Sequence, residues 1–230
     1  MKFRSSVFLF LLFALTPLAA QAGVGFSVLS FEQDQSYQPL ELPVFETIEA
    51  NTLARRAERG DGDAQAELGR LYIIGQSGVP KDPRTAVVLF RLSALQGNPS
   101  GQQRLGLAYL TSQGGLTRDD AKALEYLRLS SEQGHITSLV LLGRMYEFGR
   151  ANLPVNESIA LRNYELAAKN GNALAQTFLG LMYEHGKGGL EANREMALSL
   201  YKKAADQGHA FAKNHFDALT ILDSPPPYTE

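Results

Sequence analysis

One interval constrains this sequence more than any other feature: the same residue types return every 37 positions over most of its length. A Leu-Gly pair first stands at 68–69, and it returns three more times with unchanged spacing. Glycine also keeps this interval, at Gly60, Gly97, Gly134, Gly171 and Gly208. No insertion breaks the register, which indicates tandem structural units that pack mainly against their neighbours.

The first part of each unit has the spacing of an amphipathic helix. In the first unit Ala64, Leu68, Leu71 and Tyr72 follow one another at intervals that place them on one helix face. Asp61 comes just before this helix, where its side chain can accept hydrogen bonds from the free N–H groups. The glycine after each Leu leaves the packing face without a side chain, so we expect a second helix to approach closely there.

The second part of each unit predicts that second helix. It follows a turn at 75–81 that is rich in Gly and Pro. Asp82 is expected to cap the helix, Pro83 to occupy its first turn, and Ala86 and Phe90 to face inward. One unit is therefore a helical hairpin that cannot bury its apolar face alone, and stacked neighbours complete the core.

The predicted fold is an all-α solenoid of stacked antiparallel helical hairpins. The hairpins form four repeats, at 60–96, 97–133, 134–170 and 171–207, and single cap helices are expected before and after them, at 45–59 and 208–222. The solenoid as a whole spans 45–222. Atypical terminal units of this kind are usual in repeat proteins.

The two ends of the chain predict a targeting signal and two non-helical segments. Lys2 and Arg4 precede a short apolar run, and Ala20-Gln21-Ala22 closes it, which is typical of a secretory signal peptide at 1–22. An uncleaved anchor is the alternative, but the apolar run is shorter than a membrane span needs. Residues 23–44 are expected to form an extended or flexible arm, and 223–230 a disordered Pro-rich tail. The predicted location is the bacterial periplasm, with secretion as the alternative.

Composition excludes several classes of function. The chain has 22 Lys and Arg against 24 Asp and Glu, and this balance argues against a nucleic-acid binder that relies on phosphate attraction. It has no cysteine and 4 histidines, so thiolate chemistry is excluded and material for a metal site is scarce. We expect no cofactor, no metal and, after cleavage of the signal peptide, no membrane span.

The candidate catalytic residues have simpler explanations within the repeat. Ser199 and Lys202 fit a Ser-x-x-Lys pattern, yet the equivalent positions in other repeats carry unrelated residues. His135 and His209 occupy the capping position that Asp61 holds in the first repeat. The chain is therefore predicted not to be an enzyme.

The residues at 171–183, Gly-Asn-Ala-x-Ala-Gln-x-x-Leu-Gly-x-x-Tyr, resemble the Sel-one-like repeat family, a relative of the tetratricopeptide repeats. The resemblance extends over 60–208 and suggests an exported bacterial member. Two departures, Ser112 and the turn at 150–152, replace glycines of the other repeats and put the local turn geometry in question. What the resemblance implies is a scaffold or regulator in envelope assembly, secretion, signalling or host interaction.

The opposite face of the first helices is the candidate partner-binding surface. Its residues vary between repeats while the core positions do not, and they are Arg70, Ile73, Ile74, Leu107, Leu110, Arg144, Glu147, Phe148, Leu181, Glu184 and His185. The same face is expected to include Ala66, Gln103, Val140 and Thr177. Stacked hairpins curve, so these residues would line a concave groove suited to a peptide or helix.

The sequence thus predicts a non-enzymatic scaffold or adaptor of the cell envelope that binds a segment of another protein. One alternative is a secreted factor that engages host or competitor proteins. A less favoured alternative is a hydrolase acting on β-lactam or cell-wall substrates.

Overall fold

The computed structural model describes residues 41–221, and all of its regular structure is helical. The predicted signal peptide at 1–22, most of the predicted arm and the predicted tail lie outside the described residues. The helices are α4 (Ile48–Glu58), α5 (Gly62–Ile74), α6 (Pro83–Leu95), α7 (Pro99–Thr111), α8 (Asp120–Glu132), α9 (Ile136–Glu147), α10 (Glu157–Lys169), α11 (Ala173–His185), α12 (Arg194–Asp206) and α13 (Ala210–Ile221), with a short 3-10 turn, η1 (Gln113–Gly115). Within 41–221, no helix is both long and apolar enough to cross a bilayer.

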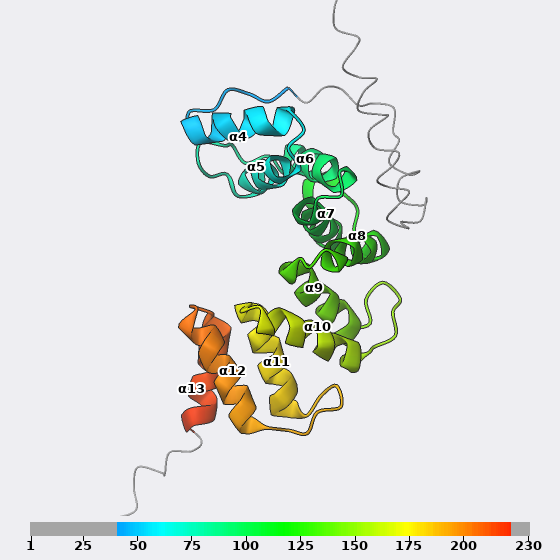
Figure 1. The fold of residues 1–230 in the computed structure, drawn as a ribbon, viewed down its shortest axis with the longest axis vertical. Helices are drawn as coiled ribbons and strands as arrows, with labels where there is room; N and C mark the ends of the chain where they lie inside the picture. The colour runs from blue at the N-terminus through cyan, green and yellow to red at the C-terminus, as the bar shows by residue number, and fades with distance from the viewer. Residues whose placement is uncertain (1–40, 222–230) are drawn as a thin grey trace, which may run out of the picture.

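The helices form four antiparallel hairpins, α5–α6, α7–α8, α9–α10 and α11–α12, which stack in chain order. In Figure 1 the row begins with α4 at the upper left, passes through α8 and α10 on the right, and ends with α13 at the lower left. The row of helices therefore bends into an arc. The predicted all-α solenoid with a repeat of 37 residues is confirmed.

Capping side chains start the helices as the sequence predicts. The Asp61 carboxylate accepts from the Ala64 N–H at 3.0 Å, and Asn172 does the same for Ala175 at 2.9 Å. Asp82 accepts from both Arg84 and Thr85 at the start of α6. Each cap satisfies N–H groups that have no partner inside the helix.

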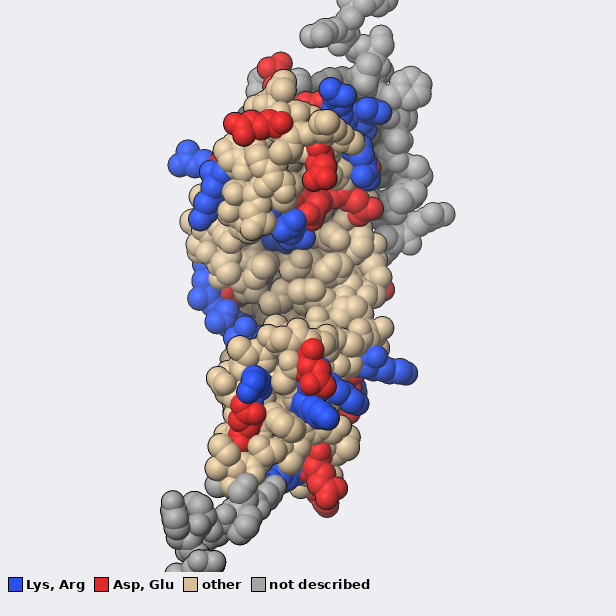
Figure 2. Space-filling view, turned by 90° about the vertical axis from the view of Figure 1, so that its left-hand side faces the viewer, with Lys and Arg blue, Asp and Glu red and all other residues tan. Residues whose placement is uncertain are grey.

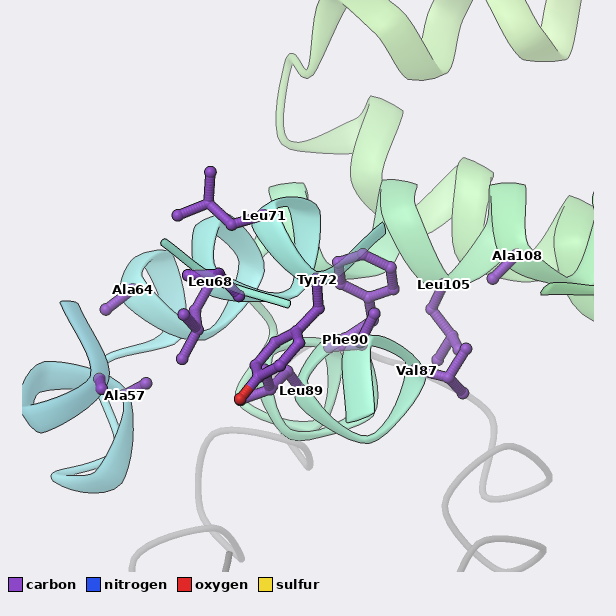
Figure 3. Packing of buried hydrophobic residues seen from close by; sticks show 14 of the residues in the cluster. Ala57, Ala64, Leu68, Leu71, Tyr72, Val87, Leu89, Phe90, Leu105 and Ala108 are labelled. Carbon is purple, nitrogen blue, oxygen red and sulfur yellow. The ribbon is translucent and has the colours of Figure 1, made fainter. Parts of the chain in front are cut away.

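The glycine of each Leu-Gly pair lies against a large side chain of the second helix. A Cβ atom added at Gly69 would lie 2.5 Å from the Phe90 ring, and one at Gly143 would lie 2.5 Å from the Tyr164 ring. Both rings are almost fully buried. Figure 3 shows Phe90 in the same cluster as Leu68 and Tyr72 of α5 and Leu105 of α7. Close approach of the two helices thus requires glycine at this position.

A pair of glutamines also joins the two helices in three of the four repeats. Gln96 donates to the buried Gln65 at 2.7 Å, and Gln207 donates to the buried Gln176 at 2.8 Å. The second repeat has the same bond between Gln133 and Gln102. In the third repeat Leu139 and Asn170 occupy these positions. Both members change together, which is expected because a single change would strand a buried amide.

The turns keep one backbone conformation even where the sequence departs from glycine. Ser112 ends α7 with φ 55° and ψ 37°, the left-handed conformation that Gly75 and Gly186 adopt at the ends of α5 and α11. Ala151 and Asn152 both have φ 57° in the third repeat, where Gly188 and Gly189 of the fourth repeat also have positive φ. The departures therefore do not change the left-handed turn.

Both ends of the row carry single helices. Phe45, just before α4, is buried with its ring 6.0 Å from that of Tyr72. On α13, Ala212 is buried against α12, and Asp217 occupies the place of the repeat glycine. Lys213 forms an ion pair with Asp217 at 2.5 Å. This polar pair covers the position at which a further second helix would pack.

Candidate partner-binding face

The first helices leave one continuous set of positions open to solvent. On α5 these are Asp63, Glu67, Arg70 and Ile74, at spacings of four, three and four, which is one side of a helix. All are exposed or half-buried, as are their equivalents Ser100, Arg104, Leu107 and Thr111 on α7, Thr137, Leu141, Arg144 and Phe148 at α9, and Leu174, Phe178, Leu181 and His185 on α11. We call these sixteen residues the first-helix stripe.

The stripe belongs to the helices on the inner side of the arc in the first two hairpins. In Figure 1, α5 and α7 lie to the left of α6 and α8, on the side toward which both ends of the row point, whereas α9 lies above α10 and α11 lies to the right of α12. Figure 2 shows the molecule from that side. Uncharged residues fill the centre of this view, with Lys and Arg side chains at its left edge and charged side chains of both signs above and below.

Seven of the sequence-predicted site residues lie on the stripe: Arg70, Ile74, Leu107, Arg144, Phe148, Leu181 and His185. Phe148 is the most open of the apolar ones, with 59% of its surface exposed. The other four, Ile73, Leu110, Glu147 and Glu184, are half-buried at one equivalent position beside the stripe. Ile73 and Leu110 pack against the core cluster of the first two repeats.

The expectation that Ala66, Gln103, Val140 and Thr177 lie on the open surface is wrong. All four are buried, with at most 6% of their surface exposed. Thr177, for example, contacts the His209 ring nitrogen at 2.9 Å, at the start of the next first helix. This position faces the adjacent hairpin, so packing covers it.

Glu147 and Glu184 are held by tyrosines of the second helices. The Tyr164 hydroxyl donates to Glu147 at 2.9 Å, and the Tyr201 hydroxyl donates to Glu184 at 2.5 Å. Burial, followed by the charge and hydrogen bond of Glu147, raises the pKa of Tyr164 well above its ordinary value. The phenol therefore stays protonated and able to donate. These two glutamates serve the packing of their own hairpins.

The same pairing explains why the first two repeats carry apolar residues there. The residue 17 positions after Ile73 is Phe90, and the residue 17 positions after Leu110 is Leu127. Neither side chain has a hydroxyl that needs an acceptor. Glutamate thus appears in the repeats with tyrosine, and an aliphatic residue in the repeats without it.

Sequence reasoning missed the position of Glu67, which is part of the stripe. Its equivalents lie over the second helix of the preceding repeat: Phe178 stacks on Tyr164 with centroids 5.2 Å apart, and Arg104 lies 6.0 Å from the Phe90 centroid. His215, the equivalent on α13, lies 5.2 Å from the Tyr201 ring. The signal was available, because this position varies among Glu, Arg, Leu, Phe and His while its spacing continues the stripe.

The charged part of the stripe centres on Glu67 and Arg70. The Arg70 guanidinium donates to both Glu67 oxygens, at 2.6 to 2.9 Å. This bidentate pair lowers the pKa of Glu67 and raises that of Arg70. Farther along, the Arg144 guanidinium lies 5.5 Å over the Phe178 ring, within reach of a cation–π interaction.

His135 and His209 stand just before α9 and α13, whereas Ser199 and Lys202 lie on α12. His135 begins α9, but its side chain makes no capping hydrogen bond, and burial together with the charge of Arg104 lowers its pKa. His209 does accept from the Ala212 N–H, at 3.4 Å. Ser199 and Lys202 are exposed on α12. Among residues 41–221, no group of three His, Asp or Glu side chains could hold a metal ion.

Comparisons with solved structures identify the architecture. A protective antigen of uropathogenic Escherichia coli with the SLR fold matches at a TM-score of 0.62 and 32% identity, over 76% of this chain and 38% of that one. A Sel1 repeat protein from Oxalobacter formigenes matches at 0.61 and 28%, over 74% and 48%. An immunity protein from Pseudomonas aeruginosa matches at 0.50 and 25%, over 75% and 70%. This chain thus spans less than half the length of the first two.

A search of the curated proteins gave no match. The comparison with family models, in contrast, agrees with the structural comparison. The model of the Sel1 repeat matches four times in succession, at 62–98, 99–135, 137–172 and 173–209. These boundaries follow the four hairpins with a start two or three residues after that of the predicted repeats. The chain therefore belongs to the Sel1 repeat family, whose helical solenoids are in general non-enzymatic scaffolds for protein–protein interaction.

Proposed function

We propose that this chain is an adaptor of the bacterial cell envelope that binds a segment of a partner protein along the first-helix stripe. The observation that carries the proposal is the contrast within the repeats. The core positions of Leu68 and Ala86 hold the same residue in every hairpin, whereas the stripe mixes Phe148 and Ile74 with Arg70 and Arg144. Exposed apolar side chains bordered by charges suit the capture of a peptide or helix.

The shape of the molecule supports this use of the stripe. An arc of hairpins offers a long surface on its inner side without any need for a deep cavity. Uncharged residues fill the centre of that side in Figure 2. A partner segment lying along the stripe would contact side chains from several repeats, so specificity would come from their combination.

The envelope location rests on the N-terminal pattern, with its basic start, short apolar run and Ala20-Gln21-Ala22. The alternative of a secreted factor acting on host or competitor proteins is favoured by one structural relative, described as a protective antigen. Fractionation separates them: an envelope adaptor is released by osmotic shock, whereas a secreted factor accumulates in the medium. The hydrolase alternative would require Ser199 for activity, and Ser199→Ala with a β-lactam assay tests it.

Substituting two open residues of the stripe should strongly weaken partner capture. In the double variant Arg144→Glu, Phe148→Ala, one charge is reversed and the most exposed aromatic side chain is lost, so binding should fall at least about tenfold. Crosslinking pull-downs from the envelope fraction measure this, with the captured proteins quantified against the unmodified chain. Far-UV circular dichroism and thermal unfolding verify that the solenoid remains folded.

A matched control tests whether location decides the effect. Arg162 and Leu166 are also exposed, but on the second helix α10. The variant Arg162→Glu, Leu166→Ala makes the same kinds of change and should leave capture intact. If both double variants lose the partner equally, or if neither does, the stripe is not the binding surface.

A further inference from the structure

Arg104, on α7 in the second hairpin, is a cation without a sufficient partner. Its side chain is 27% exposed, and its Nε atom is buried without a hydrogen-bond partner among residues 41–221. Burial lowers its pKa, yet a guanidinium remains charged in proteins. Buried or partly buried charges are normally paired, because removing a charge from water is costly.

The nearest carboxylate is already engaged. Arg104 Nη2 lies 3.8 Å from Glu67 Oε2, at the outer limit of an ion pair, whereas Arg70 binds both oxygens of Glu67 at hydrogen-bond distance. Two guanidinium groups therefore share one carboxylate. Burial together with the nearby charge of Arg104 lowers the pKa of His135, and an imidazole offers no negative charge in either protonation state.

Apolar surface lies next to this unbalanced charge. Leu107, three residues further along α7, is half-buried on the stripe. Arg144, at the position equivalent to Leu107 on α9, supplies an exposed cation. The stripe around Leu107 therefore combines positive charge with an apolar side chain, and the complementary ligand is a carboxylate next to an apolar group.

We propose that Arg104 is the anchor for an acidic side chain of the partner segment, and that Leu107 receives an apolar side chain beside it. The proposal rests on the binding function assigned to the stripe and narrows its partner to a segment with Asp or Glu adjacent to apolar residues. A partner carboxylate would supply the negative charge that Glu67 cannot provide to Arg70 and Arg104 together.

Short random peptides displayed on phage and selected against the full chain provide the probe. The selected peptides should contain an Asp or Glu next to an apolar residue. Changing that acid to its amide should weaken binding to the unmodified chain about tenfold, since hydrogen bonds between charged groups are roughly that strong. The same change should have little effect on binding to Arg104→Gln, and Arg104→Lys should recover part of the affinity.

The controls separate this inference from the proposed function. Neutral residues occupy the position of Arg104 in other repeats, Leu141 and Phe178, so Arg104→Gln should fold, which circular dichroism verifies. Arg162→Gln removes the same charge from α10 and should not alter binding. One outcome would overturn the acidic anchor alone. The selected peptides would lose binding to the double variant Arg144→Glu, Phe148→Ala, but they would bind equally well when their own acid is changed to its amide and when the chain carries Arg104→Gln. Binding that survives every stripe variant, or a selection that yields no binder, would count against both.

Discussion

Replacing Gly143 by alanine is expected to lower the free energy of unfolding by about 2 kcal/mol. The new Cβ would lie 2.5 Å from Cε1 and 2.8 Å from Cδ1 of Tyr164, so the ring or the helix must shift. Tyr164 is fully buried and tied to Glu147, which leaves it little room to move. Overpacking of this severity costs up to about 3 kcal/mol, and the better helix propensity of alanine returns about 1 kcal/mol. Urea unfolding monitored by circular dichroism measures the difference.

The matched control is Gly106→Ala in the second hairpin. There the nearest atoms are Leu127 Cγ at 3.0 Å and the Ala123 carbonyl oxygen at 3.2 Å, and a leucine side chain can adjust more readily than an aromatic ring. We expect its stability to change by less than about 1 kcal/mol, because the small clash and the propensity gain offset each other. Equal losses for the two variants would mean that the ring contact is not the reason for glycine at this position.

The architecture could be predicted because each repeated residue has a local structural role within its hairpin. Asp82 caps a helix, the glycine after Leu68 admits a second helix, and Tyr72 fills the core between them. Every hairpin requires capping, close helix approach and core packing at the same places, so the residues that provide them return at the interval of 37 residues. The positive φ angles of the third turn could not be predicted from the sequence, because Ala151 and Asn152 adopt them without the glycine that usually indicates this conformation.

The open face of the first helices was predicted only in part, because one helix wheel does not show what covers it. Counting from the core placed Ala66 and Ile73 on the open side, yet the adjacent hairpin buries the first and the core half-buries the second. Glu67 was omitted although it follows Ala66 directly and stays partly open. How far one hairpin covers the next depends on the angle between them, which the intervals in the sequence do not specify.

The pairing of glutamate with tyrosine predicts a strong coupling between Glu147 and Tyr164. Tyr164→Phe removes the hydroxyl that donates to a carboxylate whose side chain is only 13% exposed, and should cost about 1.5–3 kcal/mol of stability. Lys187, 3.7 Å from Glu147, can compensate only in part, because its ammonium group also lies 3.8 Å from Glu157. Glu147→Ile alone should cost about 1–3 kcal/mol, since it leaves the buried phenol without its acceptor.

The double variant Glu147→Ile, Tyr164→Phe reproduces the Ile73 and Phe90 of the first hairpin, where no hydroxyl needs an acceptor. It should therefore be more stable than the sum of the single losses predicts, by at least about 1 kcal/mol. Chemical unfolding of the four proteins under one set of conditions completes the cycle. Single losses that add to the double loss within about 0.5 kcal/mol would show that the two positions are independent. Coupling of the expected size would instead mean that the two residues of each pair depend on each other for stability. Glu147 would then act in the packing of its own hairpin, and recognition would fall to the open residues of the stripe.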